Sequence, residues 1–326
     1  MSGVEIADVS ADDNDIRLDR WFRRHYPGLK HGALEKMLRT GQIRVDGKRA
    51  KANLRLFEGQ RVRIPPQAAA APPKREGRKS DPADAAFVQS LVIYRDDDVI
   101  ALNKPAGLAV QGGTKTTRHL DAMLDALQFG SKERPRLVHR LDRDTSGVLL
   151  LARGANVAAR LSKSFQSRNV RKIYWALAIG VPEIDEGRID LPLGKRAGPR
   201  GERMMADGQD GKSAVTLYSI IETAGQTAAW LALWPLTGRT HQLRVHCAAI
   251  GHPVAGDGKY GGEAAFLPAE GVARQLHLHA RELRLPHPSA RGELNITADL
   301  PPHMAESWDL FGFDRNYAED PFAKIG

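Results

Sequence analysis

The chain has 326 residues, of which 42% are hydrophobic and 27% charged, so it is long enough for two domains and lacks the composition of a disordered protein. A single cysteine, Cys247, excludes a disulfide within the chain and fits a reducing compartment. The acidic first 15 residues do not resemble a secretion signal, and no apolar run approaches the roughly 18 residues of a membrane span, so we expect a cytoplasmic protein without membrane contact.

The net charge of +9 is unevenly distributed along the chain. Residues 16–64 contain 14 Lys and Arg against four Asp and Glu, a net charge of +10 that accounts for the whole excess. A basic balance by itself is weak evidence for a polyanionic partner. A small basic module beside a near-neutral body, however, is typical of an enzyme with an attached nucleic-acid-binding domain.

This basic module follows a polar lead-in at residues 1–15. Apolar residues at helical spacing predict two short helices between residues 16 and 40. Two alternating segments, 42–45 and 61–64, predict strands, and Asp46-Gly47 is a strong hairpin signal. We therefore assign residues 16–64 to one small α/β domain.

Residues 65–90 are rich in Pro, Ala and charge without periodicity, which predicts a linker. Residues 91–300 then form the predicted second domain, and residues 301–326 a C-terminal tail. Six segments of the second domain have the pattern of strands: 91–94, 99–103, 147–153, 171–180, 213–221 and 228–234. One clear helix lies around residues 157–165. Because strands dominate without a regular strand–helix repeat, we expect an α+β fold with a mixed, largely antiparallel sheet.

The densest polar segment between two apolar runs is HRLDRDTSG, residues 139–147. It places two carboxylates and two arginines within five residues, directly before a strongly apolar strand. A salt-bridged surface turn would explain such a cluster. A nucleophilic aspartate with charged neighbours would explain it as well.

A second polar segment, TGRTHQLRVH at residues 237–246, begins a predicted helix. A buried aspartate needs a cation to stay ionised, because desolvation raises the pKa of a carboxyl group and a nearby arginine lowers it. Arg239 or Arg244 could supply that cation to an aspartate of residues 139–147 in a water-poor pocket. The alternative is a helix cap whose arginines face solvent.

Two shorter segments also stand out. The sequence NKPAG at residues 103–107 follows a strand and predicts a rigid turn. Tyr174 alternates to the face opposite Ile173 and Trp175, where a lone tyrosine is more often a core residue than a catalytic one. The histidines lack the spacing of a metal-binding helix and the glycine-rich segments lack that of a phosphate-binding loop, so we expect no metal and no nucleotide cofactor.

Taken in order, NKPAGL, HRLDRDTSG, KIYWAL and TGRTHQLRVH, followed by GHPVAGDGKYG, resemble the RluA family of pseudouridine synthases over residues 91–290. The basic module resembles an S4 RNA-binding domain. The combination most resembles the RluC subgroup, which modifies uridines of large-subunit (23S) ribosomal RNA. The resemblance implies an isomerase that converts uridine to pseudouridine in RNA and needs no cofactor.

The resemblance also implies roles for particular residues. Asp142 matches the catalytic aspartate, and Arg140 matches an arginine that takes the place of the flipped uridine in the RNA stack. Tyr174 matches a tyrosine that stacks on the target base and is a candidate for proton transfer. Arg244 is the candidate charge partner of the aspartate, and Arg239 a candidate RNA contact. Further candidate RNA contacts are His139 in the catalytic segment and Lys36, Arg39, Arg44 and Lys48 in the basic module.

Two other functions fit parts of the pattern. A non-catalytic RNA-binding protein would predict loss of the acidic residue at position 142, yet Asp142 is present. A glycosidase-like hydrolase would pair two carboxylates about 5–10 Å apart, and Asp144 is close to Asp142 in sequence. The basic module favours RNA as the partner, and we expect the protein to act as a monomer.

Overall fold

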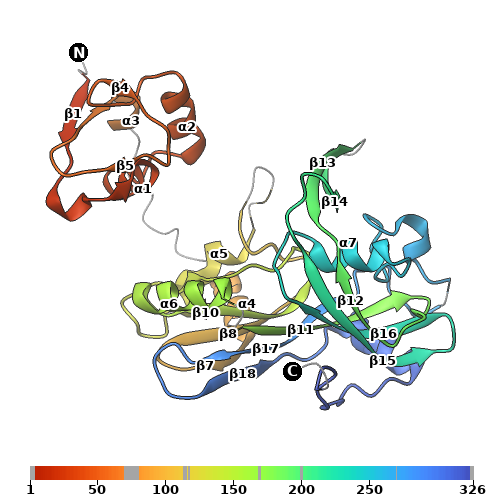
Figure 1. The fold of residues 1–326 in the computed structure, drawn as a ribbon. Coiled ribbons are helices and arrows are strands. Elements are labelled where there is room, and N and C mark those ends of the chain that lie inside the picture. Colours follow the sequence, from red (N-terminus) through yellow and green to blue (C-terminus); the bar gives the residue numbers. More distant parts are fainter. Residues whose placement is uncertain are drawn as a thin grey trace. The chain divides into compact units, whose positions relative to one another are not determined.

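The computed structural model describes residues 4–69, 81–112, 116, 118–167, 170–198, 201–268 and 270–323. The chain divides into two compact units, Met1–Lys79 and Ser80–Gly326 (Figure 1). This division falls inside the segment predicted as a linker, of which residues 70–80 lie outside the described residues.

The first unit is built from short elements. Its strands are β1 (Glu5–Asp8), β2 (Ile16–Arg17), β3 (Arg44–Val45), β4 (Lys48–Arg49), β5 (Arg55–Leu56) and β6 (Arg61–Ile64). Its helices are α1 (Leu18–His25), α2 (His31–Arg39) and α3 (Pro66–Ala69), with the 3-10 helix η1 (Ala11–Asp13). One sheet has the order β1-β6-β3-β4, and β2 pairs with β5. Apolar residues of α1 and α2, among them Trp21, Phe22 and Leu34, pack with those strands into one core.

The polar lead-in predicted at residues 1–15 contains folded elements of the first unit, β1 and η1. Residues Glu5–Asp8 form β1 and pair antiparallel with β6. Val9 is 2% exposed in the core, and the buried Asp13 carboxylate lies 2.8 Å from Arg24 Nη1 and 2.7 Å from His25 Nε2. The partners of this segment lie more than ten residues away, so its local composition carried no signal of them.

The second unit contains one large sheet and its covering helices. Its strands are β7 (Val92–Arg95), β8 (Val99–Lys104), β9 (Arg136–Leu137), β10 (Ser146–Ala152), β11 (Arg171–Ile179), β12 (Glu186–Asp190), β13 (Leu193–Gly198), β14 (Gly201–Ala206), β15 (Val215–Ala224), β16 (Ala228–Pro235), β17 (Leu278–Pro286) and β18 (Glu293–Thr297). Its helices are α4 (Pro82–Ser90), α5 (Leu120–Met123), α6 (Ala155–Gln166), α7 (Gln242–Ala249) and α8 (Pro302–Phe311), with the 3-10 helices η2 (Leu124–Leu127) and η3 (Gly262–Ala265).

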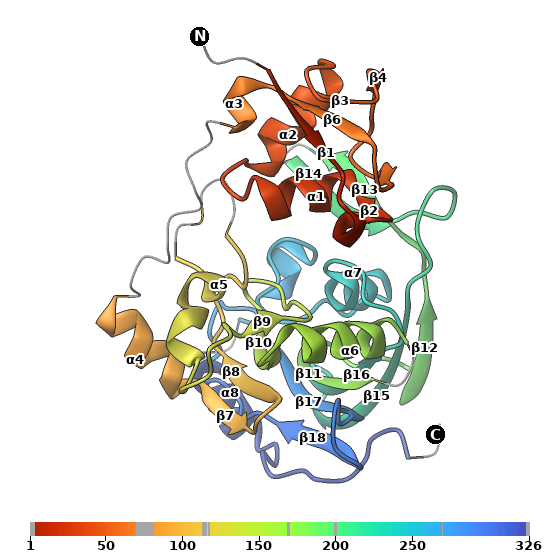
Figure 2. The ribbon, with the colours of Figure 1, turned by 90° about the vertical axis from the view of Figure 1, so that its left-hand side faces the viewer.

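The large sheet has the order β12-β15-β16-β11-β17-β10-β8-β7, with β18 paired to β17 and β9 to β10. Figures 1 and 2 show β7 and β8 at one end of this sheet and β12 at the other. Strands β10 and β17 are parallel, whereas the other pairs are antiparallel. The predicted α+β fold with a mixed, largely antiparallel sheet is therefore confirmed.

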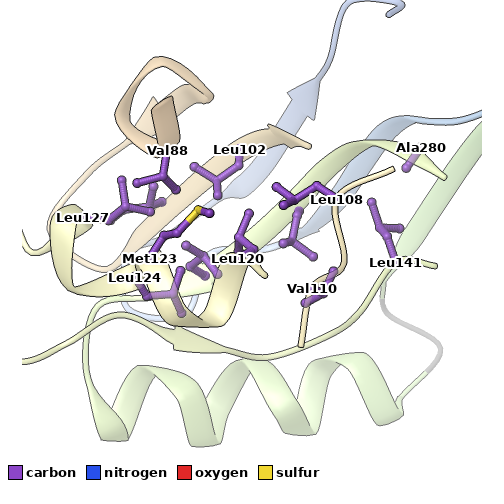
Figure 3. Packing of buried hydrophobic residues seen from close by; sticks show 13 residues of the cluster. Val88, Leu102, Leu108, Val110, Leu120, Met123, Leu124, Leu127, Leu141 and Ala280 are labelled. Carbon is purple, nitrogen blue, oxygen red and sulfur yellow. The ribbon is translucent and has the colours of Figure 1, made fainter. Parts of the chain in front are cut away.

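The central strands β8 and β10 are buried on both faces, which explains why they are almost continuously apolar. Alternate residues such as Leu102 and Leu149 pack against α4, α5 and η2 (Figure 3). The intervening residues, such as Ala101 and Leu150, pack against Leu161 of α6. Leu141 belongs to the cluster in Figure 3, so the polar segment 139–147 is anchored to this core near its start.

The predicted linker at residues 65–90 is wrong over its last nine residues. The Asp81 side chain accepts a hydrogen bond from the Ala83 amide at 3.0 Å, Pro82 occupies the first turn, and α4 follows. Val88 of this helix is fully buried against the sheet. The start signal was present in the sequence, but Asp81 and Pro82 fell inside a composition typical of a linker.

The predicted separate tail at residues 301–326 is also wrong over its described part. Trp308 of α8 is fully buried, and its ring centroid lies 5.4 Å from that of Trp230 on β16. Phe322 is 1% exposed, and Asp320 pairs with Arg171 on β11. Apolar side chains of the C-terminal segment thus complete one face of the sheet, and residues 301–323 belong to the second unit.

Gly147 is required where β10 pairs with β17. Its φ is +108°, and a Cβ on it would lie 2.2 Å from the backbone oxygen of Ala280. We expect Gly147→Ala to lower the free energy of unfolding by at least about 3 kcal/mol, because backbone strain and overpacking add. Urea denaturation checks this against Gly130→Ala, whose φ is +82° but whose Cβ would meet nothing within 4 Å. Equal losses in both variants would contradict the steric explanation.

Candidate active site

A cavity of about 440 Å³ lies on the second unit, where HRLDRDTSG, KIYWAL and TGRTHQLRVH meet. It is lined by parts of residues 139–145, 172–174 and 235–244, together with Phe165 and Leu278. Asp142, Tyr174 and Arg244, predicted as catalytic residues from distant positions in the sequence, all line it. A neighbouring cavity of about 700 Å³ shares Asp142, Arg244 and His241, so Asp142 lies where the two cavities join.

The position of Asp142 is set by the residues on both sides of it. The Leu141 side chain is 7% exposed and packs in the core, whereas 24% of the Asp142 side chain is exposed at the cavity. Ser146 Oγ lies 2.9 Å from His279 Nδ1, and His279 Nε2 lies 3.0 Å from the Ala298 carbonyl oxygen. Because that carbonyl can only accept, Nε2 carries the proton and the Ser146 hydroxyl donates to Nδ1. The carboxylate is therefore held between two buried anchors.

Lys104 supports the same segment from within the protein. It is fully buried, and its Nζ donates to the carbonyl oxygens of Pro105, Leu108 and Arg143 at 2.8–2.9 Å. Burial lowers the pKa of Lys104 to about 7, although the charges of Asp144 and Asp142 raise it. Three carbonyl acceptors accommodate all three protons of an ammonium group, so the charged form fits this site. The sequence pattern predicted a rigid turn here but gave no sign that this lysine joins it to the Asp142 segment.

We expect Lys104→Met to lower the free energy of unfolding by about 3 kcal/mol or more, because three carbonyl oxygens lose their buried donor. Urea denaturation measures this loss. Lys132→Met is the matched control, since Lys132 is exposed and should change stability by less than about 0.5 kcal/mol. Unchanged stability of the Lys104 variant would contradict the proposed support.

Arg244 lies close to Asp142, but its direct ion pair is with another carboxylate. Arg244 Nε and Nη2 donate to the two Asp257 oxygens at 2.7 and 2.6 Å, and the two side chains are 8% and 0% exposed. Burial lowers the pKa of Arg244, but the hydrogen bonds and charge of Asp257 outweigh burial and raise it. The charge of Asp142 acts on Arg244 in the same direction. The structure therefore gives Arg244 a direct ion pair with Asp257, which had no part in the prediction, and a charge interaction with Asp142 without a direct ion pair.

His241 lies next to Asp142 and would form an ion pair with it if protonated. The sequence pattern gave His241 no role. Its Nε2 lies 3.9 Å from Asp142 Oδ2, and its Nδ1 lies 2.6 Å from Tyr260 Oη. Burial lowers the pKa of His241, while the charge of Asp142 raises it less. A neutral ring that accepts from the Tyr260 hydroxyl at Nδ1 keeps its proton on Nε2, the nitrogen nearest Asp142. Its place in THQLR, beside Arg244, was the available signal.

Tyr174 lies on β11 and borders the cavity. Its pKa is raised by burial and by the negative charge of Asp142, so the phenol keeps its proton at neutral pH. The cavity therefore presents a neutral aromatic ring beside a carboxylate. This character fits contact with a planar base.

His139, a predicted RNA contact, lines the cavity and also makes contacts that support its own segment. Its Nε2 accepts from the Leu150 amide at 2.8 Å, and its ring stacks on Phe165 with 4.5 Å between centroids. Burial, with the nearby charge of Lys172, lowers the pKa of His139 to about 3. A neutral histidine with one nitrogen engaged in this way holds the segment in place.

The remaining predicted contacts are at the protein surface. Arg140 is exposed at the cavity, and Arg239 lines it while donating from Nε to the Ser213 carbonyl oxygen at 3.1 Å. In the first unit the candidates are all exposed: Lys36, Arg39, Arg44 and Lys48. Arg44 differs from the others because it also donates to the Gly41 and Gly47 carbonyls at 3.2 and 3.0 Å.

Among the described residues, no group of three or more His, Cys, Asp and Glu side chains could hold a metal ion. Cys247 is buried in α7, where burial raises the pKa of its thiol to about 12, so it is not a nucleophile at neutral pH. No helix in the described part of the chain has the length and apolar character needed to cross a bilayer.

Comparisons with known proteins identify the family to which this cavity and its segments belong. The family model for RNA pseudouridylate synthase matches residues 98–249, which contain NKPAGL, HRLDRDTSG, KIYWAL and TGRTHQLRVH. The ribosomal large subunit pseudouridine synthase C of Rickettsia bellii is 35% identical over 292 residues, covering 88% of this chain and 95% of the relative. The protein of that name from Vibrio cholerae is 33% identical over 323 residues, covering 93% and 96%.

Solved structures show the same likeness. The human RNA pseudouridylate synthase domain containing 4 is 28% identical with a TM-score of 0.59, covering 71% of this chain and 97% of that one. The likeness therefore covers nearly the whole of the solved structure and more than two thirds of this chain. This chain belongs to the RNA pseudouridylate synthase family, in the RluA group that its sequence motifs indicate.

Proposed function

We propose that this protein converts uridines of large-subunit ribosomal RNA to pseudouridine, with Asp142 as the catalytic nucleophile acting on a flipped-out uridine. The relatives named as ribosomal large subunit pseudouridine synthases match this chain over 95–96% of their own length. The observation that carries the proposal is Asp142, partly exposed at the junction of two cavities within a segment anchored on both sides.

The reaction breaks the N1–C1′ bond of uridine, turns the base and rejoins it through C5. The base must first leave the RNA stack, which costs a few kcal/mol. Attack on C1′, attack on C6 and removal of the C2′ proton each need a carboxylate at the bound nucleotide. Asp142 supplies that carboxylate, and Arg244 with its buried partner Asp257 fixes a positive charge beside it.

Two further side chains receive roles in this proposal. Arg140 is exposed at the cavity mouth, where a planar guanidinium can fill the gap that the flipped base leaves in the RNA stack. Tyr174 presents a neutral ring inside the cavity, where it can stack on the uracil. The C5 proton must then be removed, and Tyr174 beside Asp142 is the candidate for that proton transfer.

In this proposal the first unit is an S4-like domain that provides most of the RNA binding. Its net charge of +10 lies within residues 16–64, and candidate phosphate contacts are exposed on α2 and the β3–β4 hairpin. We propose that the protein acts as a cytoplasmic monomer. The reaction as proposed uses no metal or other cofactor.

Replacing three exposed cations of the first unit together, by Lys36→Gln, Arg39→Gln and Lys48→Gln, should weaken RNA binding. It should also make log Kd depend less steeply on log salt, by about 0.7–0.9 for each phosphate that the protein no longer neutralises. Filter binding of ribosomal RNA at several salt concentrations measures both quantities. A variant that binds like wild type at every salt concentration would contradict the role of this unit in RNA binding.

The function itself is tested by mapping pseudouridines in ribosomal RNA from cells with and without the gene. We expect one or more pseudouridines of the large-subunit RNA to be missing without the gene. They should return with the wild-type gene but not with the Asp142→Asn gene. An identical map in all strains would refute the proposed function.

A further inference from the structure

A third cavity, here called the flanking cavity, adjoins the active-site cavity and has no role in the function proposed above. Its volume is about 1130 Å³, and it lies between the end of α6 and the strands β12, β15 and β16. The two cavities share six lining residues: Phe165, Lys172, Pro235, Thr237, Gly238 and Arg239. The two cavities therefore adjoin, and the boundary that the shared residues line is here called the passage.

Lys172 is a half-buried cation at this passage, whereas Arg239 is exposed. Lys172 lies two residues before Tyr174 on β11, so the two side chains emerge on the same face of the strand. Burial lowers the pKa of Lys172, and no carboxylate offsets that effect. Among the described residues, no ion pair or hydrogen bond of its ammonium group is found. A positive charge partly kept from water without an anion is costly, and an anion bound at the passage would relieve that cost.

The walls of the flanking cavity suit a nucleotide. One part is apolar and includes Val170, Leu217, Trp234 and the 38% exposed Leu236. Positive charge comes from Lys172, Arg239 and Arg188, which is paired with Asp190, and the one carboxylate in the lining is Glu186. Grooves that hold single-stranded nucleic acid combine apolar surface for the base with cations for the backbone in this way. The passage is also the route by which a strand with one base in the active-site cavity can continue.

We propose that the flanking cavity binds the nucleotide next to the target uridine, and that Lys172 binds the phosphate that joins the two. This inference rests on the proposed function, because the target uridine must occupy the active-site cavity. A phosphate at Lys172 would hold the strand beside Tyr174 and so position the flipped base against Asp142. Lys172 is then a binding residue whose contact is independent of the chemistry at Asp142.

The charge of Lys172 is tested by the salt dependence of kcat/KM. The substrate is ribosomal RNA from cells lacking the gene, labelled with tritium at C5 of uracil, because pseudouridine formation releases that tritium to water. Lys172→Met should lower kcat/KM about tenfold at low salt and make its logarithmic salt slope shallower by about 0.7, the value for one phosphate on a single strand. Lys172→Arg should restore the slope. Lys163→Met, an exposed cation on α6, should leave both quantities unchanged.

The occupant of the flanking cavity is tested at the exposed Leu236. Leu236→Glu places a negative charge in the cavity without disturbing the core, and should lower kcat/KM at low salt about tenfold by repelling phosphate. Leu236→Gln should have a much smaller effect, since it is polar without charge. Leu310→Glu is the matched control, because Leu310 is 51% exposed on α8 and lines none of the three cavities.

The outcomes separate this inference from the function on which it rests. If wild-type protein releases no tritium, the proposed function fails and the flanking site fails with it. If wild-type protein is active but Lys172→Met keeps the wild-type salt slope, Lys172 binds no phosphate and the inference is wrong, even if activity falls. If Leu236→Glu and Leu236→Gln lowered kcat/KM equally, the proposal that the flanking cavity binds a nucleotide would likewise be wrong.

Discussion

Replacing Asp142 with asparagine is expected to reduce single-turnover pseudouridine formation by at least about a thousandfold, because the amide cannot act as the nucleophile. Asparagine has nearly the same shape, and the side chain is partly exposed, so the fold should persist. Affinity for ribosomal RNA should stay within about twofold of wild type, since the cations that bind phosphates remain. Tritium release from C5-labelled RNA measures the rate, and filter binding the affinity.

Asp144→Asn is the matched control for this prediction. Asp144 lies two residues away in the same segment and is exposed, but it lines only the neighbouring cavity of about 700 Å³ and not the one that contains Tyr174. We expect this variant to retain activity within about tenfold of wild type. Equal losses in the two variants would indicate a pair of acting carboxylates, as in a glycosidase, and would contradict a single nucleophile.

Replacing Arg244 with methionine is expected to have the largest effect on stability together with a strong effect on activity. The substitution leaves Asp257, which is 0% exposed, as an unpaired buried charge. Breaking a buried pair by removing one partner costs about 3–5 kcal/mol, so the midpoint of urea denaturation should fall markedly. Product formation should fall as well, because the positive charge beside Asp142 is removed.

A double variant separates these two effects. In Arg244→Met with Asp257→Asn no buried charge remains, and the asparagine oxygen can still accept from the Lys259 and Tyr260 amides. We expect stability to recover by about 2 kcal/mol or more relative to the single variant. Activity should stay low in both. Recovery of activity along with stability would show that Arg244 acts only by keeping the protein folded.

The sequence predicted the parts of this protein that depend on local pattern. The strands around HRLDRDTSG are nearly continuous apolar runs because both faces are buried, and they stand out for that reason. The hairpin at Asp46-Gly47 and the helix around Leu161 follow from short-range signals in the same way. The motifs also placed Asp142, Tyr174 and Arg244 at one site, and the structure brings all three to one cavity.

The partners of these residues could not be predicted from pattern, because folding brings them from distant loops. Asp257 follows Gly256, where a Cβ would lie 1.7 Å from the Gln275 backbone oxygen. That close approach positions the Asp257 carboxylate under Arg244, and only the folded loop defines it. Lys104 is similar, since its acceptor on Arg143 lies 39 residues away. The sequence showed a lysine in a turn but not the carbonyl groups to which its ammonium group donates.

The domain boundaries were missed for a related reason. Composition suggested loose segments at residues 1–15, 65–90 and 301–326. Within them β1 gains its stability by pairing with β6, and α4 and α8 gain theirs by burying Val88 and Trp308. Short elements that rely on tertiary contacts carry little intrinsic propensity, so composition alone assigns them to linkers and tails.

Formation of pseudouridine in ribosomal RNA through Asp142 is tested most directly with purified components. Wild-type and Asp142→Asn protein are each incubated with ribosomal RNA from cells lacking the gene, and pseudouridine is measured by mass spectrometry after digestion. We expect new pseudouridine with wild-type protein and none above background with the variant. No new pseudouridine with wild-type protein, or equal amounts with both, would contradict the assignment of Asp142 as the nucleophile of this enzyme.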